Sequence, residues 1–243
     1  AENSITPSDI NAALVLVNDL AVGNEKTSLI ARLNAAKERK IKLGIDNIQD
    51  YKKIFINKKV GLITNPSGMN SNFISSIDIL KDNTSLVALF AAEHGIRGNS
   101  EAGGTVGNEI DEKTGLPVYS LYGKTKKPTA KMLKDIDVLA YDMQDVGARF
   151  YTYINTMAYA MEACAENNKI FAVFDRPNIV SGAVQGTILN SNFKSFVGMY
   201  PIPQRYGMTA GELAKFINKE YNINCTLSVI PMTGWTRNMY YDN

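Results

Sequence analysis

The sequence predicts an α/β fold, an open, mostly parallel, Rossmann-like sheet with helices on both faces, preceded by a small helical hairpin. From about residue 44 onward, short apolar runs alternate with stretches of helical periodicity. The runs are almost continuously apolar, which is typical of strands that are covered on both faces. Alternation of such strands with helices indicates right-handed βαβ crossovers, and these build a mostly parallel sheet.

The composition sets the size and the broad class of the protein. Its 243 residues are 45% hydrophobic and 21% charged, so we expect one globular domain at 43–243 with an appendage at 1–42. The formal net charge is +2 and both signs are scattered, which gives no footprint of nucleic-acid binding. No apolar run approaches the roughly 20 residues that span a bilayer. We therefore expect no nucleic-acid partner and no membrane span.

The N-terminal segment carries helical spacing. In residues 6–20, TPSDINAALVLVNDL, Thr6 can cap a helix whose first turn contains Pro7. After a glycine turn, Asn24 is a suitable cap for a second helix. Two short amphipathic helices joined by such a turn form an antiparallel hairpin. We interpret it as an appendage without chemistry of its own, a spacer or an attachment module.

The remaining elements follow in order along the chain. Each predicted strand is a run rich in β-branched and apolar residues, and the strands cover 59–64, 85–91, 137–143, 170–175 and 225–230. The predicted helices lie between the strands, at about 73–81, 129–135, 151–168 and 209–221.

Two cysteines, Cys164 and Cys225, are too few for a disulfide framework or a thiolate zinc site, and we interpret both as buried free thiols.

Polar residues directly follow four of the predicted strands. In an open α/β sheet, ligands bind in the crevice beyond the carboxyl ends of the strands, so these residues are candidates for a site. In chain order they are Thr64 and Asn65, then Glu93 and His94, then Asp142, Gln144 and Asp145, and then Asp175, Arg176 and Asn178. The alternative is that they cap helices or form turns, as Asp and Asn do routinely. Four such groups at one edge favour a functional cleft.

Two further features belong to this group. Arg149, Tyr151 and Tyr153 follow the third strand in the segment QDVGARFYTY, although either tyrosine can equally begin a buried helix. His94 is the only histidine of the chain and stands directly after Glu93 on a glycine-flanked turn. A single Glu-His pair is usually structural, but here it is part of a larger constellation.

Several kinds of chemistry lack their motifs. The phosphate-binding patterns GxGxxG and GxxxxGK[ST] are absent, which disfavours a nucleotide enzyme, and there is no GxSxG motif for a serine hydrolase. One histidine and no clustered cysteines argue against a zinc site, so we expect neither metal nor cofactor. The remaining carboxylates, amides, arginines and tyrosines suit a polyhydroxylated ligand and acetal hydrolysis. Glu93 can act as the acid, with Asp142, Asp145 or Asp175 opposite it, while retention or inversion stays open.

Seven segments together carry a family resemblance. They are GLITNPSG, EHGIRG, TGLPVYSLYG, DMQDVGARFYTY, FDRPN, SFVGMYPIPQRYGMTAGEL and GWTR. Over about residues 43–243, the chain resembles the exo-β-N-acetylmuramidase (NamZ) family. The resemblance implies removal of terminal N-acetylmuramic acid from the non-reducing end of peptidoglycan fragments. It also implies a secreted or cell-envelope protein whose signal peptide is already removed, since the start AENSITPSDI contains none.

The resemblance also suggests roles for individual residues. The glutamate of the EHG motif is the favoured acid/base of the family and corresponds to Glu93. Together with the strand-end argument, this gives as catalytic candidates Glu93, His94, Asp142 and Asp145. The candidates for substrate binding are Asn65, Arg97, Gln144, Arg149, Tyr151, Tyr153, Asp175, Arg176, Asn178 and Tyr206. The alternative function is a non-catalytic module that binds peptidoglycan or another cell-wall glycan on the same fold.

The chain departs from the family pattern at a few positions. Ala92 and Ile179 stand where the family usually has proline, and Tyr206 stands where it has histidine, which bears on specificity. Family members also continue past the GWTR motif, so we expect the family's C-terminal portion to be missing here. The preferred peptide stem and the oligomeric state are left open.

Muramic acid differs from N-acetylglucosamine by a lactyl ether whose carboxylate is ionised at neutral pH. A site that selects it should present a cation, preferably an arginine. Arg149 and Arg176 follow strand ends and are the first candidates, with Arg97 and Arg205 behind them. For Arg176 the alternative is a bridge to neighbouring aspartates that holds the loops.

Overall fold

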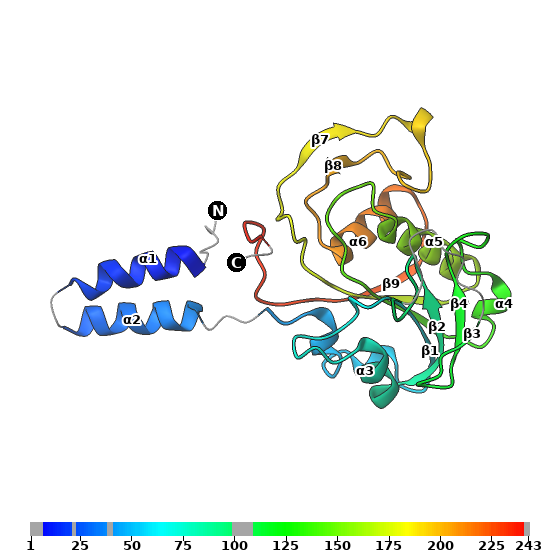
Figure 1. The fold of residues 1–243 in the computed structure, drawn as a ribbon, viewed down its shortest axis with the longest axis horizontal. Coiled ribbons are helices and arrows are strands. Elements are labelled where there is room, and N and C mark those ends of the chain that lie inside the picture. The colour runs from blue at the N-terminus through cyan, green and yellow to red at the C-terminus, as the bar shows by residue number, and fades with distance from the viewer. Residues whose placement is uncertain (1–6, 21–22, 38–40, 99–108, 241–243) are drawn as a thin grey trace.

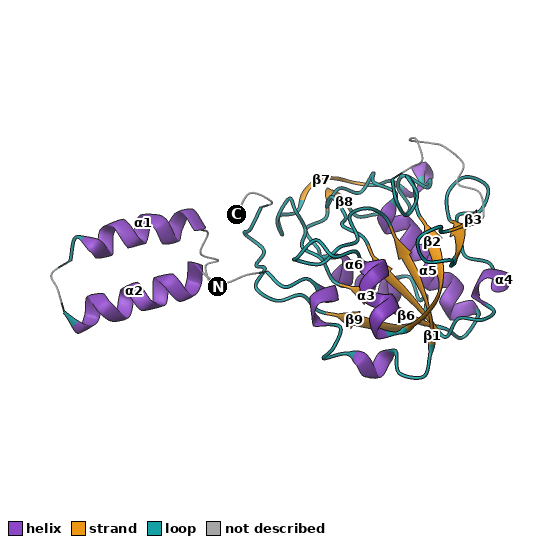
Figure 2. Cartoon of the chain, turned by 60° about the horizontal axis from the view of Figure 1, so that its bottom comes forward, coloured by secondary structure: helices purple, strands orange, loops and turns teal. Residues whose placement is uncertain are grey.

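The computed structural model describes residues 7–20, 23–37, 41–98 and 109–240. Helices α1 (Pro7–Asn18) and α2 (Asn24–Lys37) lie side by side and apart from the sheet (Figures 1 and 2). This pair confirms the predicted helical hairpin. Thr6, its predicted cap, lies outside the described residues.

The body of the protein is built on a seven-stranded sheet, and this confirms the predicted fold class. The strand order is β3-β4-β2-β1-β5-β6-β9, and only the edge strand β3 runs antiparallel. The bounds are β1 (Lys59–Thr64), β2 (Ser85–Ala91), β3 (Glu109–Ile110), β4 (Pro117–Ser120), β5 (Val138–Asp142), β6 (Ile170–Phe174) and β9 (Thr226–Ile230). All five predicted strands are present within a residue of their predicted ends.

The strand order determines where a ligand can enter. From β1 the chain winds through β2 to β4 in one direction, and from β5 through β6 to β9 in the other. The winding therefore reverses between β1 and β5, which are hydrogen-bonded neighbours. In sheets of this kind, the crevice at such a switch point, beyond the carboxyl ends of the strands, is where ligands bind.

Helices cover both faces of the sheet, as Figure 2 shows. Helices α4 (Ala130–Leu133), α5 (Tyr153–Glu166) and α6 (Ala210–Glu220) pack on one face, while α3 (Ser76–Asn83) and the 3₁₀ turns Gly44–Asn47 and Lys52–Ile54 lie on the other. Successive residues of β1 serve the two cores, since Leu62 packs with α3 and Ile63 packs with α5, and both are fully buried. This double burial explains the continuous apolar runs.

Side-chain caps begin three of the helices. Ser75 accepts a hydrogen bond from the amide of Ile77 in α3, and Thr129 accepts one from the amide of Met132 in α4. Thr209 forms a capping box with Glu212 at α6. The helix predicted at 73–81 therefore begins later, at Ser76, because Phe73 has a left-handed backbone with φ of 61° and precedes the cap.

Several short elements were not predicted. Besides β3 and β4, they are the antiparallel ribbon of β7 (Gln185–Ile188) with β8 (Pro203–Arg205) and the 3₁₀ turn Ser191–Phe193. These pieces are two to four residues long and too polar to carry a strand pattern.

Cys164 and Cys225 are both free and buried, which confirms their interpretation as buried thiols. Among the described residues, no helix has the length and apolar character needed to cross a membrane.

Candidate active site

The four polar groups predicted from the sequence follow β1, β2, β5 and β6 at one edge of the sheet. The register pairs Thr64, the last residue of β1, with Ala91 of β2 and with Asp142 of β5. Glu93, which follows β2, therefore lies on one side of β1. Asp142, at the end of β5, lies on the other side, at the switch point.

Glu93 and His94 form a tight turn directly after β2. The amide of Gly95 donates to the carbonyl of Ala92 at 3.1 Å, and both His94 and Gly95 have left-handed backbone, with φ of 73° and 75°. A left-handed conformation is costly for any residue with a Cβ, and strained residues of this kind gather at functional sites. The side chains of Glu93 and His94 remain only partly buried.

Two hydroxyl groups hold the carboxylate of Glu93. The Thr152 hydroxyl donates to its Oε2 at 2.8 Å from the residue that precedes α5. The Tyr122 hydroxyl, on the loop after β4, also hydrogen-bonds to Glu93, and this bond raises the pKa of Tyr122. Neither residue was singled out from the sequence, because both contacts join segments far apart along the chain. The one available signal is that both lie inside the family-like segments.

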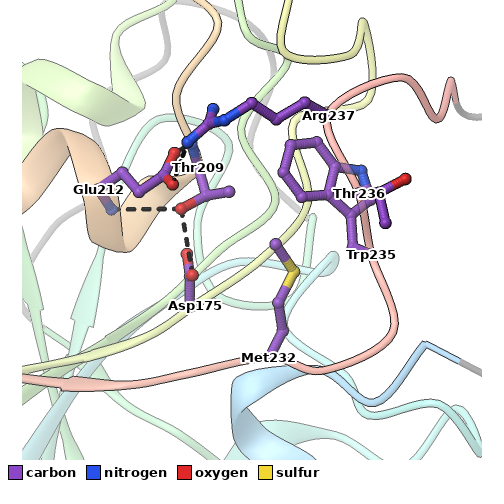
Figure 3. A pocket seen from close by; sticks show the side chains of 7 residues that line it. All are labelled: Asp175, Thr209, Glu212, Met232, Trp235, Thr236 and Arg237. Atoms are coloured by element: carbon purple, nitrogen blue, oxygen red, sulfur yellow. Dashed lines mark hydrogen bonds and ion pairs between the residues drawn. The ribbon is translucent and has the colours of Figure 1, made fainter. Parts of the chain in front are cut away.

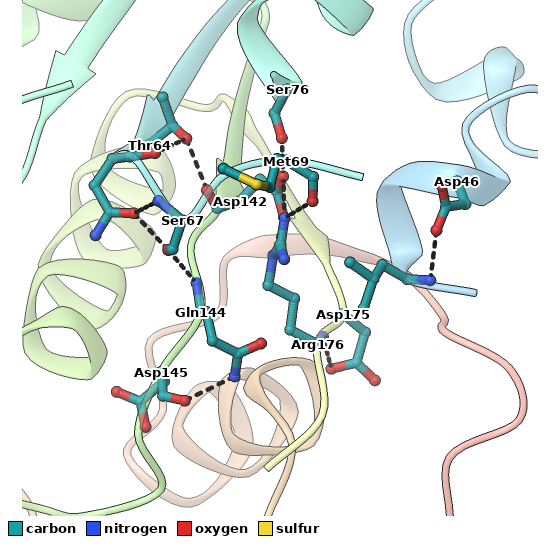
Figure 4. A network of polar contacts seen from close by, with 12 residues as sticks. Asp46, Thr64, Ser67, Met69, Ser76, Asp142, Gln144, Asp145, Asp175 and Arg176 are labelled. Carbon is teal, nitrogen blue, oxygen red and sulfur yellow. Dashed lines mark hydrogen bonds and ion pairs between the residues drawn. The ribbon is translucent and has the colours of Figure 1, made fainter. Parts of the chain in front are cut away.

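A chain of polar contacts connects the switch-point strands (Figure 4). Asn65 accepts hydrogen bonds from the amide and the hydroxyl of Ser67, at 2.9 and 2.5 Å, and the Ser67 hydroxyl accepts from the amide of Gln144 at 2.9 Å. The Asn65 side chain also hydrogen-bonds to the hydroxyl of Tyr153, whose pKa burial raises. Tyr153 thus begins α5 and contacts the site, while Tyr151 is 42% exposed.

Asp142 and Arg176 form a buried ion pair (Figure 4). The guanidinium is bidentate, with Nε–Oδ1 at 2.6 Å and Nη2–Oδ2 at 2.8 Å, and it also donates to the carbonyl of Met69 at 2.7 Å. The hydroxyl of Ser76 donates to the same carboxylate. Arg176 therefore bridges to an aspartate, as one sequence interpretation proposed, although the partner is Asp142 and not the adjacent Asp175. The pair fastens the ends of β5 and β6 together.

Asp145 is a buried carboxyl with an incomplete set of partners. Its Oδ2 accepts hydrogen bonds from the amide of Gly147 at 2.7 Å and from the hydroxyl of Tyr206. Its Oδ1 has no hydrogen-bond partner among the described residues. Burial raises the pKa of Asp145, and the hydrogen bond from Tyr206 opposes this effect. Tyr206, at the position where the family has histidine, is itself buried and points its hydroxyl at this carboxyl.

Asp175 follows β6, and its side chain contacts the N-terminal end of α6. It accepts hydrogen bonds from the Thr209 hydroxyl at 3.1 Å and from the amide of Gly211 at 2.8 Å, and burial raises its pKa. It also borders a pocket of about 280 Å³, whose other lining residues are Thr209, Glu212, Met232, Trp235, Thr236 and Arg237 (Figure 3). This pocket lies at the β6 and β9 side of the sheet, so β1 and β5 separate it from Glu93.

Asn178 donates to the carbonyl of Met208 at 3.0 Å and shapes the turn after β6.

The four candidate arginines all have partners within the fold. Arg97 forms a bidentate pair with Asp111, with both contacts at 2.9 Å, and this pairing lowers the pKa of Asp111 to about 2. Arg149 donates to the carbonyls of Thr187 and Ile202 at 2.7 and 2.6 Å. Arg205 donates to the side chains of Gln185 and Ser181 at 2.9 and 2.7 Å. With Arg176 bound to Asp142, these guanidinium groups hold loops together.

Fold and site together define a Rossmann-like α/β domain with a partly buried, hydroxyl-bound glutamate beside its switch point. The family model described as "Exo-beta-N-acetylmuramidase NamZ, N-terminal" matches residues 60–243, and the chain belongs to this family. This confirms the predicted family.

Relatives of known sequence or structure support the assignment. Over 212 residues, the chain is 56% identical to the peptidoglycan beta-N-acetylmuramidase NamZ of Bacillus subtilis, a match that covers 86% of this chain and 51% of the relative. Two crystal structures of DUF1343 family proteins from Bacteroides fragilis are also similar. The first has a TM-score of 0.78 and 50% identity, covering 84% of this chain and 53% of its own. The second has a TM-score of 0.71 and 38% identity, covering 83% and 54%. The chain thus spans about half the length of these relatives.

Proposed function

We propose that this chain forms the Glu93-bearing part of a glycoside hydrolase that removes terminal N-acetylmuramic acid from the non-reducing end of peptidoglycan fragments. The observation that carries the proposal is the geometry of Glu93, a partly buried carboxylate beside the switch point that two neutral hydroxyls orient. The homologue from Bacillus subtilis is a peptidoglycan beta-N-acetylmuramidase, which supports the same reaction here. Because this substrate belongs to the cell wall, we place the working protein in the envelope or outside the cell.

Glycoside hydrolysis needs an acid for the leaving oxygen and a second group at the anomeric carbon. Glu93 protonates the departing glycosidic oxygen, and the second group either attacks the anomeric carbon or activates the incoming water. For the second group, Asp142 is the weaker candidate, since Arg176 engages both of its oxygens. Asp145 keeps Oδ1 without a partner among the described residues and is therefore the better candidate. His94, next to Glu93, orients the acid or contacts the ligand.

The surroundings of Glu93 offer contacts for a sugar ring. Tyr151 is 42% exposed, so part of its ring can contact the apolar side of a pyranose, and it packs against Phe150 with ring centroids 5.5 Å apart. The amide groups of Asn65 and Gln144 suit hydroxyl recognition, although the Nε2 of Gln144 already donates to the carbonyls of Asp145 and Pro177 at 2.7 and 2.8 Å. We retain both amides and both tyrosines of the segment FYTY, Tyr151 and Tyr153, as substrate-binding residues.

Replacement of Glu93 by Gln in the full-length protein tests the proposal. The amide is nearly isosteric with the carboxyl group but cannot act as an acid, so we expect kcat on a chromogenic β-N-acetylmuramide to fall by about 10²–10⁴-fold. The melting temperature and the affinity for N-acetylmuramic acid should stay close to those of the wild type.

The matched control is Glu109→Gln, since Glu109 is exposed on the edge strand β3. This variant should keep the wild-type rate. A Glu93→Gln enzyme that retains more than half of the wild-type rate would remove Glu93 from the mechanism. A wild-type protein that binds the muramide without turnover would support the alternative, a non-catalytic glycan-binding module.

A further inference from the structure

The engaged arginines raise the question of which cation meets the lactyl carboxylate of muramic acid. This question rests on the proposed function, because only a muramyl ligand brings that carboxylate. Each of the four candidate arginines already donates to a carboxylate, a carbonyl or a side-chain oxygen of the fold. Aspartates compensate the charges of Arg97 and Arg176, and the loop oxygens that Arg149 and Arg205 contact hold their guanidinium groups in place. A cation that neither pairs with a carboxylate nor holds a loop is the better candidate.

Lysines are concentrated on the segment after β4. Between Tyr122 and the end of α4 they are Lys124, Lys126, Lys127 and Lys131. Lys127 is paired with Glu162 at 3.1 Å and with Glu166 at 2.6 Å, so its charge is compensated. Lys126 differs from it, because no carboxylate of the described residues forms an ion pair with its ammonium group. Instead, its Nζ lies 4.4 Å from the centroid of the Phe196 ring.

The contact with Phe196 fixes the position of this ammonium group. Phe196 stacks on Tyr159 of α5, with ring centroids 6.0 Å apart and an interplanar angle of 7°. Its carbonyl accepts a hydrogen bond from the side chain of Asn155 at 2.6 Å. An ammonium group over an aromatic face is attracted by the ring while its remaining donors stay available. Lys126 is therefore partly buried and oriented, but uncompensated in charge.

Two independent routes along the chain connect Lys126 to Glu93. Lys126 follows Tyr122 by four residues, and the Tyr122 hydroxyl binds Glu93. On the other side, Asn155 holds the backbone of Phe196 and stands one helical turn after Thr152, which also binds Glu93. The loop that carries Lys126 therefore includes one partner of Glu93, and the segment that carries Phe196 is bonded to the helix that follows the other partner.

From this arrangement we propose that Lys126 binds the ionised lactyl carboxylate of the muramyl substrate and so selects muramic acid over N-acetylglucosamine. The ligand carboxylate supplies the counter-charge that the fold does not give to Lys126, and it forms a charge-assisted hydrogen bond with the ammonium group. The ring of Phe196 keeps the ammonium group in place before the ligand arrives.

The test compares two chromogenic β-N-acetylmuramides, one with a free lactyl carboxylate and one with the same group converted to a methylamide. In the full-length Lys126→Met variant, kcat/KM for the free carboxylate should fall by about tenfold, since hydrogen bonds to charged groups are worth at least that factor. For the methylamide, kcat/KM should change by less than about twofold. The wild-type preference for the free carboxylate should disappear in the variant.

Lys131→Met is the matched control, since Lys131 is exposed on α4 in the same basic segment. This variant should behave as the wild type on both substrates, and melting temperatures verify that all variants are folded. Equal losses on both substrates in Lys126→Met, or no loss on either, would overturn the role of Lys126 while leaving the proposed function intact. A wild-type protein that cleaves neither muramide would overturn the proposed function and this inference together.

Discussion

Glu93 follows β2 and Asp142 ends β5, the strands on either side of β1, yet the surroundings of the two carboxyl groups differ. Glu93 is partly buried and accepts hydrogen bonds from two neutral hydroxyls. Asp142 is fully buried, and the guanidinium of Arg176 engages both of its oxygens. A carboxylate held by neutral donors can still exchange a proton with a ligand, whereas a buried ion pair uses its charge within the fold. Motif membership alone does not separate these two roles.

The largest effect on the free energy of unfolding is expected at the buried ion pair of Asp142 and Arg176. Arg176→Met leaves the carboxylate of Asp142 buried without its cation, which should lower the free energy of unfolding by about 3–5 kcal/mol. Urea unfolding monitored by circular dichroism measures this loss. By contrast, Glu93→Gln should change the free energy of unfolding by less than about 1 kcal/mol, because both of its hydroxyl partners also hydrogen-bond to an amide.

The exposed pair of Arg237 and Glu212 provides the control for the buried one. Their side chains are 54% and 37% exposed, so Arg237→Met should cost less than about 1 kcal/mol. The double variant Asp142→Leu with Arg176→Met removes both buried charges and should recover much of the lost stability. A loss in Arg176→Met as small as that in Arg237→Met would show that the buried pair does not hold the two strand ends together.

Much of the fold follows from local patterns in the sequence. Strands such as Lys59–Thr64 are almost continuously apolar because successive side chains enter two different cores, and this pattern is visible without the structure. The strand β4 was not predicted because Pro117–Ser120 has only four residues, and it pairs in parallel with one strand only, β2. The order of the strands is also not encoded locally, since it depends on how the crossovers pack.

The site was predictable only as a set of residues at one edge. Which of them contact each other depends on pairs distant in sequence, such as Thr152 with Glu93, 59 residues apart, and Arg176 with Asp142, 34 residues apart. Asp142 and Asp145 were therefore predicted with equal weight, although a cation neutralises the first and the second has an oxygen without a partner among the described residues. The hydroxyl donors of Glu93 were missed for the same reason.

An intermediate effect is expected at Thr152, which we treat as a positioning residue for Glu93. Thr152→Val keeps the shape of the side chain but removes the 2.8 Å hydrogen bond to the carboxylate. We expect kcat/KM on the chromogenic muramide to fall by about tenfold, the value of one hydrogen bond to a charged group.

Thr152→Ser restores the hydroxyl group and should recover most of the rate, which a purely steric role of threonine would not explain. Thr152 makes no side-chain cap hydrogen bond to α5, so the stability of the helix should not change in either variant. If valine and serine impair the enzyme equally, or if valine has no effect, then Thr152 does not position Glu93.

The smallest effect concerns the pH dependence of stability at Asp145. Burial raises the pKa of this carboxyl above its ordinary value of 3.8, so the folded protein holds the proton more tightly than the unfolded chain. Stability is therefore greatest below the unfolded value and declines as the pH rises through the interval up to the raised folded value. Asp145→Asn removes this decline while an amide oxygen still accepts from Gly147 and Tyr206. As the pH rises above the ordinary value of 3.8, the free energy of unfolding should fall less steeply in the variant than in the wild type.

Urea unfolding at a series of pH values measures the two slopes, and the exposed residue Asp135 provides the control. Asp135→Asn should leave the wild-type slope unchanged, because an exposed carboxyl titrates almost equally in the folded and unfolded states. Asp175, whose pKa burial also raises, is present in both variants and cancels in the comparison. Identical slopes for Asp145→Asn and the wild type would mean that Asp145 is stably ionised in the fold. In that case Asp145 would be in the ionised state that an attacking or base carboxylate requires, and its unpartnered oxygen would still distinguish it from Asp142 among the described residues.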